Sequence, residues 1–493
     1  MADTYVFWET LPSIEPENQM LTFPAAFRNI KEIFVRDAYD DLYNRYMSQY
    51  HYVIVTGNPG TGKSYFSVYV LYRLRKERSD LVIVYVSVPT GIVVLFNGDT
   101  VSVAKDEKEW SSLLHEEGTI YLFDAGTQSA KIPRVTRSKT IVFSYPSRSN
   151  YHDFYKECIL GAGRGGVKVY MPTWSWDEIN KFCSIKKIES GKVRERFDRW
   201  GGIVRYIFRP VKKYDALEYA DLEDAIDNCA PEKIIDLATT LKGGDIKLNS
   251  DNVLHICVTK KLPDGLVDYT AAVVYFASDY VVDRVYEKFS NSTENTRHLV
   301  NIVNCYKWLS VSGIRGIRGQ LFERFAHFSF VNHDAEYDVK CLEPAHSMFN
   351  QVTKQKFGKL IETPLQNVAA LASQKDQKRV YLKPVQQNFE SLDAIIPPRV
   401  GFQMTVASSH PVKIVGLQKV IEALGCTKEK KFTLYFVVPR NSFKGYKKQS
   451  YDDNTKEQKD GSKKAMKIKT DGQKATEEIV EQWVLCMDLT PKL

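Results

Sequence analysis

Residues Gly57 to Ser64 form a complete phosphate-binding motif of the pattern G-x-x-x-x-G-K-S. The motif follows the apolar run Tyr52–Val55, which is typical of a buried strand, and precedes a helical pattern. Glycines at this spacing let successive backbone N–H groups point at one anion, and the start of a helix adds its positive end. The sequence therefore predicts a triphosphate site that comprises Gly57, Asn58, Pro59, Gly60, Thr61, Gly62, Lys63, Ser64 and Tyr65.

Three side chains would carry the chemistry of this site. Lys63 would contact the β- and γ-phosphates, and the Ser64 hydroxyl would bind Mg²⁺. Asp124, which follows the run 119–123, is the expected buried carboxylate that holds the metal through water. We therefore expect ATP and Mg²⁺ as cofactors. Ala125 stands where many ATPases of this type carry a water-activating Glu, so hydrolysis is expected to be slow or to use a base from elsewhere.

Apolar runs at 81–86 and 140–143 predict two more strands of a parallel sheet, and hence an α/β fold. A strand between the loop and the acid indicates the ATPase branch of this class. In that branch the polar end of the later strand senses the γ-phosphate, a role open to Ser144 or Ser147. The alternative is an ordinary strand exit before Pro146.

The segment after the sheet predicts a helical lid. Ser175 and Glu178 form a capping box that would start a helix. A Gly-Gly turn at 201–202 precedes Arg205, which would place a cation over the γ-phosphate; the alternative is a solvated charge on a helix. Arg164 is a further candidate, for an arginine finger acting within or between subunits.

A second set of polar residues lies in the C-terminal part. Glu323 sits in a helical pattern, Asp393 lies in an apolar strand, and Gln403 lies in the adjacent strand. A helix at 412–424 and strands at 432–438 and 483–489 follow. This order predicts an α/β restriction-endonuclease-like domain, in which Asp393 and the residue at 403 hold Mg²⁺ beside the scissile phosphate.

The catalytic lysine of that pattern is missing, because Thr405 occupies its position. Replacing a charged partner of the transition state by a hydroxyl commonly costs about 10²–10³ in rate. Gln403 also brings no negative charge to a metal. Lys413 and Lys419 on the following helix are candidates for a relocated lysine. The alternative is that Asp393 and Gln403 are ordinary polar residues at strand ends.

Length and composition set the outer limits. With 493 residues and 43% hydrophobic content, the chain is long enough for two to four domains. The net charge of +8 permits nucleic-acid partners without requiring them. Eight scattered cysteines are expected to be reduced thiols. No secretory signal or membrane-spanning run is present, so we expect no membrane partner and a soluble, reducing compartment, or the mature part of an exported protein.

We expect five parts along the chain: a helical lead-in at 1–47, with a helix over 25–47; a nucleotide-binding core at 48–170; a helical lid at 171–245; a coupling segment at 246–309; and the endonuclease-like domain at 310–493. The last part contains an insertion, 441–474, with ten lysines against five acids. We expect this insertion to be solvated. Its run 463–469 would serve nuclear import or phosphate contact, or would be only a soluble loop.

Four segments resemble the Crinkler effectors: Phe23–Phe27, Thr56–Phe66, Phe402–Val406 with His410-Pro411, and Gln482–Leu485. That family is similar in layout to the retrotransposon hot-spot proteins, which join a P-loop ATPase to a restriction-endonuclease-like domain. The resemblance covers most of residues 20–490. It implies secretion by a eukaryotic microbe, entry into host cells and accumulation in the host nucleus. The family's ubiquitin-like header module has no counterpart in this sequence.

Two functions therefore stay open. The first is a secreted P-loop ATP hydrolase coupled to a nuclease-like domain that acts on DNA in the host nucleus. The second is an effector with a degenerate nuclease fold that binds DNA or a host nuclear protein, with ATP as its switch. Self-association of the chain is compatible with both.

Overall fold

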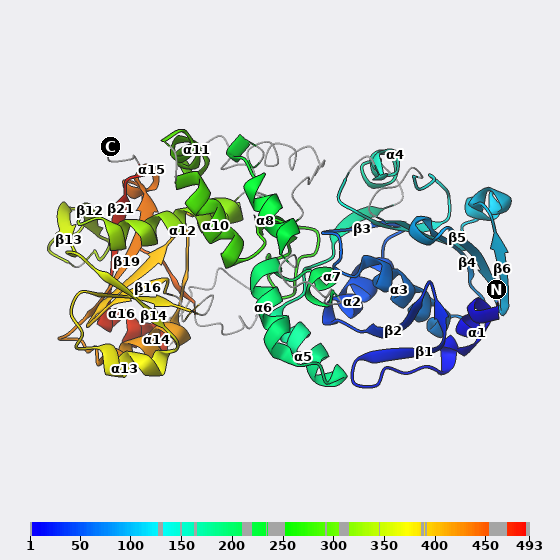
Figure 1. Cartoon of the computed structure of the whole chain (residues 1–493), viewed down its shortest axis with the longest axis horizontal. Coiled ribbons are helices and arrows are strands. Elements are labelled where there is room, and N and C mark those ends of the chain that lie inside the picture. Colours follow the sequence, from blue (N-terminus) through cyan, green and yellow to red (C-terminus); the bar gives the residue numbers. More distant parts are fainter. Residues whose placement is uncertain are drawn as a thin grey trace, which may run out of the picture. The chain divides into compact units, whose positions relative to one another are not determined.

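The computed structural model (Figure 1) describes residues 2–126, 132–147, 150–161, 165–209, 219–232, 234, 252–290, 293–304, 315–344, 346–385, 389, 392–452 and 471–489. The described residues divide into two units. The first extends to Val285 and includes Arg315 and Gly316, and the second comprises the remainder from Tyr286 onward. The boundary falls within helix α10 (Asp279–Ser290). Each unit is described by itself below.

The first unit is built on a seven-stranded sheet in the order β6-β5-β4-β7-β8-β3-β9. Its five strands from β4 to β9 in that order are parallel, and β5 and β6 extend the edge as an antiparallel hairpin. The strands predicted at 81–86 and 140–143 are confirmed as β4 and β8, and β8 lies between β3 and β7 in the sheet. The strands are β3 (Tyr52–Thr56), β4 (Val82–Ser87), β5 (Ile92–Asn97), β6 (Thr100–Ala104), β7 (Thr119–Gly126), β8 (Lys139–Ser144) and β9 (Gly166–Tyr170).

Both faces of this sheet are buried, as continuous apolar strands predict. In β3, Val53 and Val55 point into one core with helix α3 (Lys63–Glu77), while Tyr52 and Ile54 point into the other. The second core is covered by the short helical segment α4 (His152–Phe154) with the π-helical turn Tyr155–Ile159. The sheet therefore fixes the ends of β3, β7 and β8 in a rigid frame.

The N-terminal segment differs from the predicted helix over 25–47. Helix α1 (Ala2–Thr10) is followed by an antiparallel hairpin, β1 (Met20–Phe27) and β2 (Ile30–Phe34), and only then by α2 (Asp37–Leu42) and a π-helical turn, Tyr43–Met47. Ile30, Ile33 and Phe34 have helical spacing, which explains the error. In the structure, Ile33 and Phe34 are buried in different cores on either side of β2.

The lid segment is helical, as predicted. Ser175 accepts a hydrogen bond from the Glu178 N–H, and the Glu178 carboxylate accepts one from the Ser175 N–H, so the predicted capping box is confirmed. The helices are α5 (Trp176–Lys186), α6 (Ser190–Trp200), α7 (Val204–Ile207) and α8 (Ala220–Asp227). A separate antiparallel pair follows, β10 (Leu254–Cys257) and β11 (Val273–Phe276).

The second unit contains an eight-stranded mixed sheet in the order β13-β12-β21-β19-β17-β16-β15-β14. Along the chain, β15, β16 and β17 form an antiparallel series, and β17, β19 and β21 are parallel. The strands are β12 (Glu336–Cys341), β13 (Val352–Lys356), β14 (Ile361–Leu365), β15 (Val380–Pro384), β16 (Ala394–Ile396), β17 (Val400–Met404), β19 (Phe432–Pro439) and β21 (Val480–Met487). Outside this sheet, β18 (Val412–Lys413) pairs with β20 (Tyr451–Asp452).

Helix α14 (Ile414–Leu424) connects β17 to β19 and packs on the sheet through Leu417, Val420 and Ile421. An aromatic cluster that includes Phe330, Tyr381 and Phe402 joins helix α12 (Arg315–Asn332) to the sheet. The remaining helices are α11 (Thr293–Asn304), α13 (Leu371–Gln374), α15 (Arg440–Phe443) and α16 (Asp471–Ile479).

The solvated insertion predicted at 441–474 is wrong at both of its ends. Residues 441–452 fold against the sheet, where Gln449 is buried and accepts hydrogen bonds from the Gln482 side chain and the His410 N–H. Residues 471–474 belong to α16. The run 463–469 lies outside the described residues. Within the described part of the chain, no helix is both long and apolar enough to cross a membrane.

Candidate functional site

The glycine-rich loop connects β3 to α3 in the first unit. Gly57, Gly60 and Gly62 have φ angles of +140°, +79° and +103°, which residues with side chains rarely adopt. Lys63 is the first residue of α3, and its ammonium donates hydrogen bonds of 2.8 Å to the carbonyl oxygens of Gly57 and Asn58. A helix N-terminus, glycines in these conformations and a lysine therefore meet in one place, as phosphate binding requires.

Two buried aromatic side chains hold the loop from outside. The Tyr39 hydroxyl donates to the carbonyl oxygen of Gly62 at 3.1 Å, and the Trp174 indole N–H donates to that of Thr61 at 3.0 Å. Both donors bind carbonyl oxygens. The backbone N–H groups of the loop are the groups that an anion would use, so this support fixes the loop without competing for its function.

Asn58 ties the loop to strand β10. Its side-chain amide donates to the carbonyl oxygen of Ile256 at 2.9 Å, and its side-chain oxygen accepts from the Ile256 N–H at 3.0 Å. Asn58 is fully buried, so both bonds replace hydration that the amide lost on folding. The coupling segment predicted at 246–309 therefore contacts the loop directly through its first strand.

Arg205, on α7, lies beside the loop. A Cβ built on Gly60 would lie 2.7 Å from the Cβ of Arg205 and 2.9 Å from the Cγ2 of Ile203. The Gly-Gly turn at 201–202 allows this approach, since a Cβ on Gly202 would lie 2.1 Å from the carbonyl oxygen of Trp174. Arg205 itself is exposed and makes no ion pair among the described residues. Its guanidinium is thus available to a ligand at the loop.

Asp124 is buried at the end of β7 and has a partner that the sequence analysis did not predict. Its Oδ2 atom lies 2.6 Å from a guanidinium nitrogen of Arg28, whose side chain is also buried. Its Oδ1 accepts from the Gly126 N–H at 3.3 Å. Arg28 comes from the turn of the β1–β2 hairpin, far from both motifs in sequence.

The remaining predicted residues of this site are distributed as follows. Ser144, at the end of β8, is buried and donates to the carbonyl oxygen of Tyr145 at 3.1 Å, and it lies opposite Gly126 of β7. This position suits either alternative, a γ-phosphate sensor or a strand exit. Tyr65 is 47% exposed. Arg164 lies outside the described residues.

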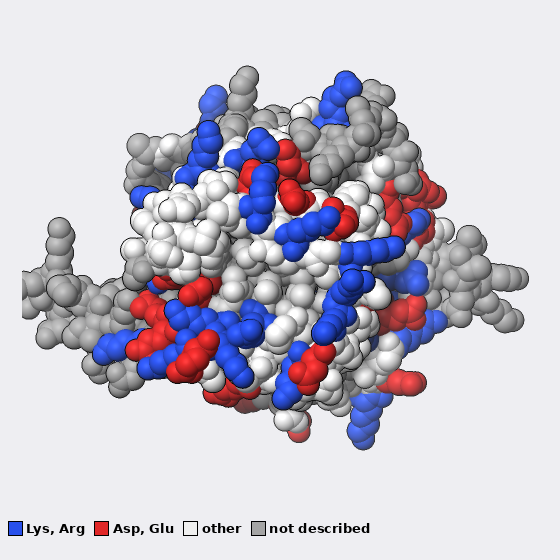
Figure 2. Space-filling model, turned by 90° about the vertical axis from the view of Figure 1, so that its left-hand side faces the viewer, with Lys and Arg blue, Asp and Glu red and all other residues white. Residues whose placement is uncertain are grey.

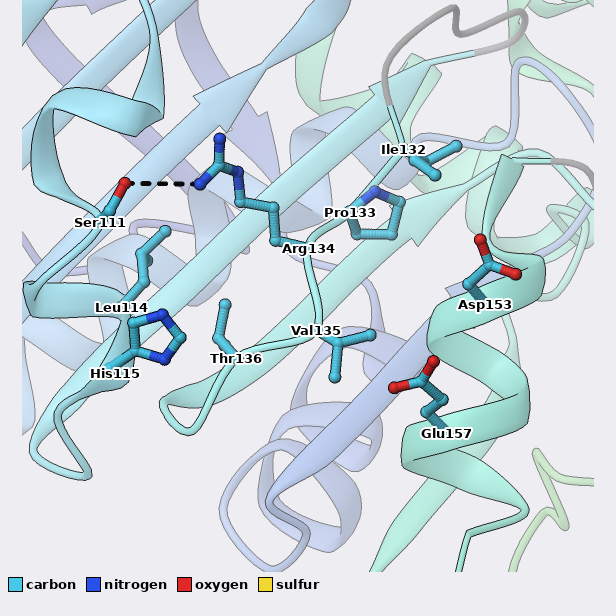
Figure 3. Close-up of a pocket in the computed structure, with 10 residues that line it drawn as sticks. All are labelled: Ser111, Leu114, His115, Ile132, Pro133, Arg134, Val135, Thr136, Asp153 and Glu157. Atoms are coloured by element: carbon cyan, nitrogen blue, oxygen red, sulfur yellow. Dashed lines mark hydrogen bonds between the residues drawn. The ribbon is translucent and has the colours of Figure 1, made fainter.

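A pocket of about 440 Å³ lies at the opposite strand ends (Figure 3). Its lining comes from residues 111–115 before β7, from 132–136 before β8, and from Asp153 and Glu157. In Figure 3, Arg134 reaches Ser111 on one wall, while the two carboxylates face the cavity from the helical segment on the other. The phosphate-binding loop follows the carboxyl end of β3. Because β3, β7 and β8 are parallel, residues that precede β7 and β8 lie at the opposite edge of the sheet. This pocket is therefore not the phosphate site.

In the second unit, Glu323 on α12 is the centre of a charged group. Its carboxylate lies 3.7 Å from the Nε2 of His327 and 3.3 Å from a guanidinium nitrogen of Arg324. The other ring nitrogen of His327 shares a 2.7 Å hydrogen bond with the Tyr381 hydroxyl. Burial alone would raise the pKa of Glu323, but His327, Arg324 and Lys383 outweigh it and lower that pKa. Burial lowers the pKa of His327.

Asp393 was predicted inside a strand, but it stands immediately before β16. Its Oδ2 accepts a hydrogen bond of 2.5 Å from the Met404 N–H of the adjacent strand. Burial and then the nearby Glu323 charge raise the pKa of Asp393 to about 8. At neutral pH this carboxyl therefore retains its proton, which is unfavourable for a cation ligand unless the cation displaces that proton.

The other predicted residues of this cluster are less suited to catalysis. Gln403 is buried, and its side-chain oxygen has no hydrogen-bond partner among the described residues. The Thr405 hydroxyl accepts from the Ala407 N–H at 3.0 Å. Lys413 is exposed in β18. Burial, and to a smaller extent the charge of Lys413, lower the pKa of the His410 imidazole. Among the described residues, no group of three or more metal-ligating side chains is close enough to hold an ion.

Three residues of the two sites were missed from the sequence. His327 lies four positions after Glu323 on one helix, a spacing that could have identified it. Lys383 on β15 acts electrostatically on both Glu323 and His327, but only the sheet order shows this. Arg28 had no signal, because its role depends on the turn of a hairpin that was predicted as a helix.

The surface of the second unit carries both signs of charge. On the face in Figure 2, Lys and Arg are interspersed with Asp and Glu rather than gathered in one basic area. Several lysines of this unit form ion pairs: Lys354 with Asp338 at 2.6 Å, Lys356 with Asp334 at 2.9 Å, and Lys431 with Glu481 at 3.0 Å. This face is therefore not an evident track for a nucleic-acid backbone.

No family model matches the chain. It is similar to two effectors of Phytophthora infestans. Crinkler effector protein 16 is 22% identical over 435 residues, and Crinkler effector protein 15 is 22% identical over 436 residues. Each alignment covers 85% of this chain and 65% of the relative, so the chain spans just under two thirds of their length. These similarities extend over most of the sequence and support the resemblance to the Crinkler effectors that the motifs indicate.

Proposed function

We propose that the first unit is a P-loop ATPase that binds ATP at residues 57–65 and hydrolyses it slowly. The observation that carries the proposal is the loop itself, with three glycines at positive φ and Lys63 at the start of α3. The sheet order supports it, because the acid strand and the loop strand are separated by one strand. Arg205 beside Gly60 supplies a cation where the γ-phosphate would lie.

The residues fit a triphosphate better than they fit Mg²⁺. Backbone N–H groups, the α3 N-terminus and Lys63 would hold the phosphates, and ATP would supply the bond to be cleaved. Ser64 is placed to contact a metal, but the Asp124 carboxylate is engaged by Arg28. Asp124 is therefore not free to hold Mg²⁺ in this arrangement. The absence of an acid at Ala125 supports slow turnover, below the typical enzyme median of about 10 per second.

Calorimetry with ATP tests this function. Lys63→Ala should weaken ATP binding by about 100-fold or more, because the phosphates lose the side-chain cation of the loop. Lys181→Ala, which removes an exposed lysine of α5, is the matched control and should bind as the parent does. ATP binding by the Lys63 variant at parent affinity would contradict the assignment.

We propose for the second unit a nuclease-like fold that binds DNA or a host protein, with ATP binding in the first unit as its switch. The order α12, β15, β16, β17, α14, β19 and the positions of Glu323 and Asp393 support a restriction-endonuclease-like origin. The protonated Asp393, the neutral Gln403 and the engaged Thr405 hydroxyl favour binding over cleavage. Metal-dependent cleavage of DNA is the second candidate, supported by the Glu323–Asp393 coupling.

Plasmid DNA incubated with Mg²⁺ or Mn²⁺, with and without ATP, separates the two. Binding without cleavage supports the binding fold, whereas cleavage that is lost in Asp393→Ala with DNA affinity unchanged supports the nuclease. DNA binding should weaken steeply with salt, since phosphate contacts dominate it. If the protein does neither, a host protein becomes the expected partner. The resemblance to the Crinkler effectors supports secretion and action in the host nucleus, which imaging of the tagged chain in host cells would test.

A further inference from the structure

The turn of the N-terminal hairpin holds an arginine in an unfavourable backbone conformation. Phe27 pairs with Ile30, so Arg28 and Asn29 form a two-residue turn, with φ angles of +56° and +63°. Turns of this kind favour Asn, Asp and Gly, because both central residues need positive φ. A non-glycine residue held in this region indicates that its side chain meets a specific demand.

The demand is a buried ion pair at the acid of the proposed nucleotide site. The Arg28 guanidinium lies 2.6 Å from Asp124 through Nη2, and its Nη1 donates to the Ser67 hydroxyl at 3.2 Å and also to the Tyr85 hydroxyl. Burial would lower the pKa of Arg28, but Tyr85 and Asp124 outweigh it and raise that pKa. Arg28 is therefore charged, and Arg28 and Asp124 together carry no net charge.

This network reaches the end of the site where a metal is expected. The Ser67 hydroxyl donates to the carbonyl oxygen of Ser64 at 2.8 Å, one turn earlier on α3. Ser67 thus connects Arg28 to the residue whose hydroxyl was predicted to bind Mg²⁺. The Arg28 guanidinium approaches Asp124 from the β1–β2 hairpin, whereas the phosphate-binding loop precedes α3.

We propose that Arg28 is a resident cation of the nucleotide site, which neutralises Asp124 so that nucleotide binds with nearly the same affinity with and without Mg²⁺. The inference rests on the proposed ATP site. An unpaired carboxylate would repel the phosphates and attract a divalent cation, and Arg28 removes both effects. Arg28 stays in place, because its withdrawal would leave a buried and unpaired carboxylate.

Calorimetric titration of the full chain with ATP, in Mg²⁺ and in EDTA, tests the inference. The two affinities of the parent should agree within about threefold, whereas in Arg28→Gln the affinity in EDTA should fall about tenfold or more below that in Mg²⁺. Arg28→Lys keeps the charge and should restore the ratio of the parent. A purely structural Arg28 would change stability in these variants but not the ratio.

The double variant Arg28→Gln with Asp124→Asn protects the test from a folding defect, because it removes both charges of the pair. Its ratio should return toward that of the parent. A parent whose affinity depends on Mg²⁺ by more than about tenfold would overturn the inference alone, as would an unchanged ratio in Arg28→Gln. A parent that binds no ATP in either condition would overturn the proposed ATP site, and with it the inference.

Discussion

The loop site of the first unit and the Glu323–Asp393 cluster of the second both bury charge at the end of a strand, but they compensate it differently. Asp124 is paired with Arg28 at 2.6 Å, whereas Asp393 has a backbone N–H and a second carboxylate nearby. Asp124 lies in an ion pair with Arg28, whereas the Asp393 carboxyl has a raised pKa and keeps its proton. A site that is already neutral is ready for an anion, while a site that must lose a proton first is less ready for a cation.

The two sites also differ in how their groups are gathered. The loop site takes most of its groups from eight consecutive residues. Tyr39 and Trp174 hold the loop from outside, and Asn58 of the loop ties it to β10. The cluster of the second unit combines three groups of helix α12 with one or two groups in or next to each of the strands β15, β16 and β17. A contiguous motif can therefore be identified from sequence. We expect a substitution in this motif to have a larger effect than one in a dispersed cluster.

The largest expected effect is on the loop. Gly60→Ala should lower the free energy of unfolding of the first unit by about 2–4 kcal/mol, because the new methyl group meets Arg205 and Ile203 at positive φ. Gly91→Ala is the matched control. Its φ is +66° and no atom lies within 4 Å of the new Cβ, so it should cost only about 1 kcal/mol. Urea unfolding measures the free energy of unfolding of both variants. Equal decreases in that free energy would show that Arg205 and Ile203 do not pack closely against Gly60.

A smaller effect, with a defined pH dependence, is expected at Asp393. Its folded-state pKa of about 8 lies above its unfolded value, so the folded protein holds the extra proton between about pH 4 and 8. Stability should therefore fall as pH rises through this range. Asp393→Asn should remove about 1–3 kcal/mol of that fall.

Urea unfolding of the parent and of Asp393→Asn at several pH values between 5 and 9 measures this difference. Asp376→Asn, at an exposed site, is the control and should follow the parent. A parent whose stability rises over this range as that of the Asn variant stays constant would show that Asp393 is ionised and paired, and the contrast with Asp124 would disappear.

The smallest effect separates two lysines. Lys383→Ala should destabilise the second unit by about 0.5–1 kcal/mol at neutral pH, since it removes a cation that favours the charged form of Glu323. Lys413→Ala should change stability by less than about 0.5 kcal/mol, as expected for an exposed position. Thermal unfolding of both variants is sufficient. The reverse order would restore Lys413 as the relocated lysine of this cluster.

The features that were predicted correctly from sequence are those that depend on a few consecutive residues. The loop, the capping box at Ser175 and Glu178, and the strands that carry Asp124 and Gln403 were all identified, because each depends on a few consecutive residues. The role of Arg205 over the γ-phosphate stays a prediction, and its position beside Gly60 is compatible with that role.

The failures concern residues whose roles depend on long-range pairing. The hairpin at 20–34 was predicted as a helix, since Ile30, Ile33 and Phe34 have helical spacing although β2 is buried on both sides. Without the hairpin, Arg28 could not be connected with Asp124, ninety-six positions later in the chain. The proton on Asp393 was missed for the same reason, because it depends on Glu323 from another element.

The Arg28–Asp124 pair has a consequence for how related chains can vary in sequence. Replacing either partner alone leaves a buried charge uncompensated, so the two positions should change together among related chains rather than drift independently. A relative with a neutral residue in place of Arg28 is expected to lack the acid as well, or to carry a cation from another strand. Covariation between the turn residue at position 28 and the strand residue at position 124, which are far apart in sequence, would then result from the need to keep this buried charge paired.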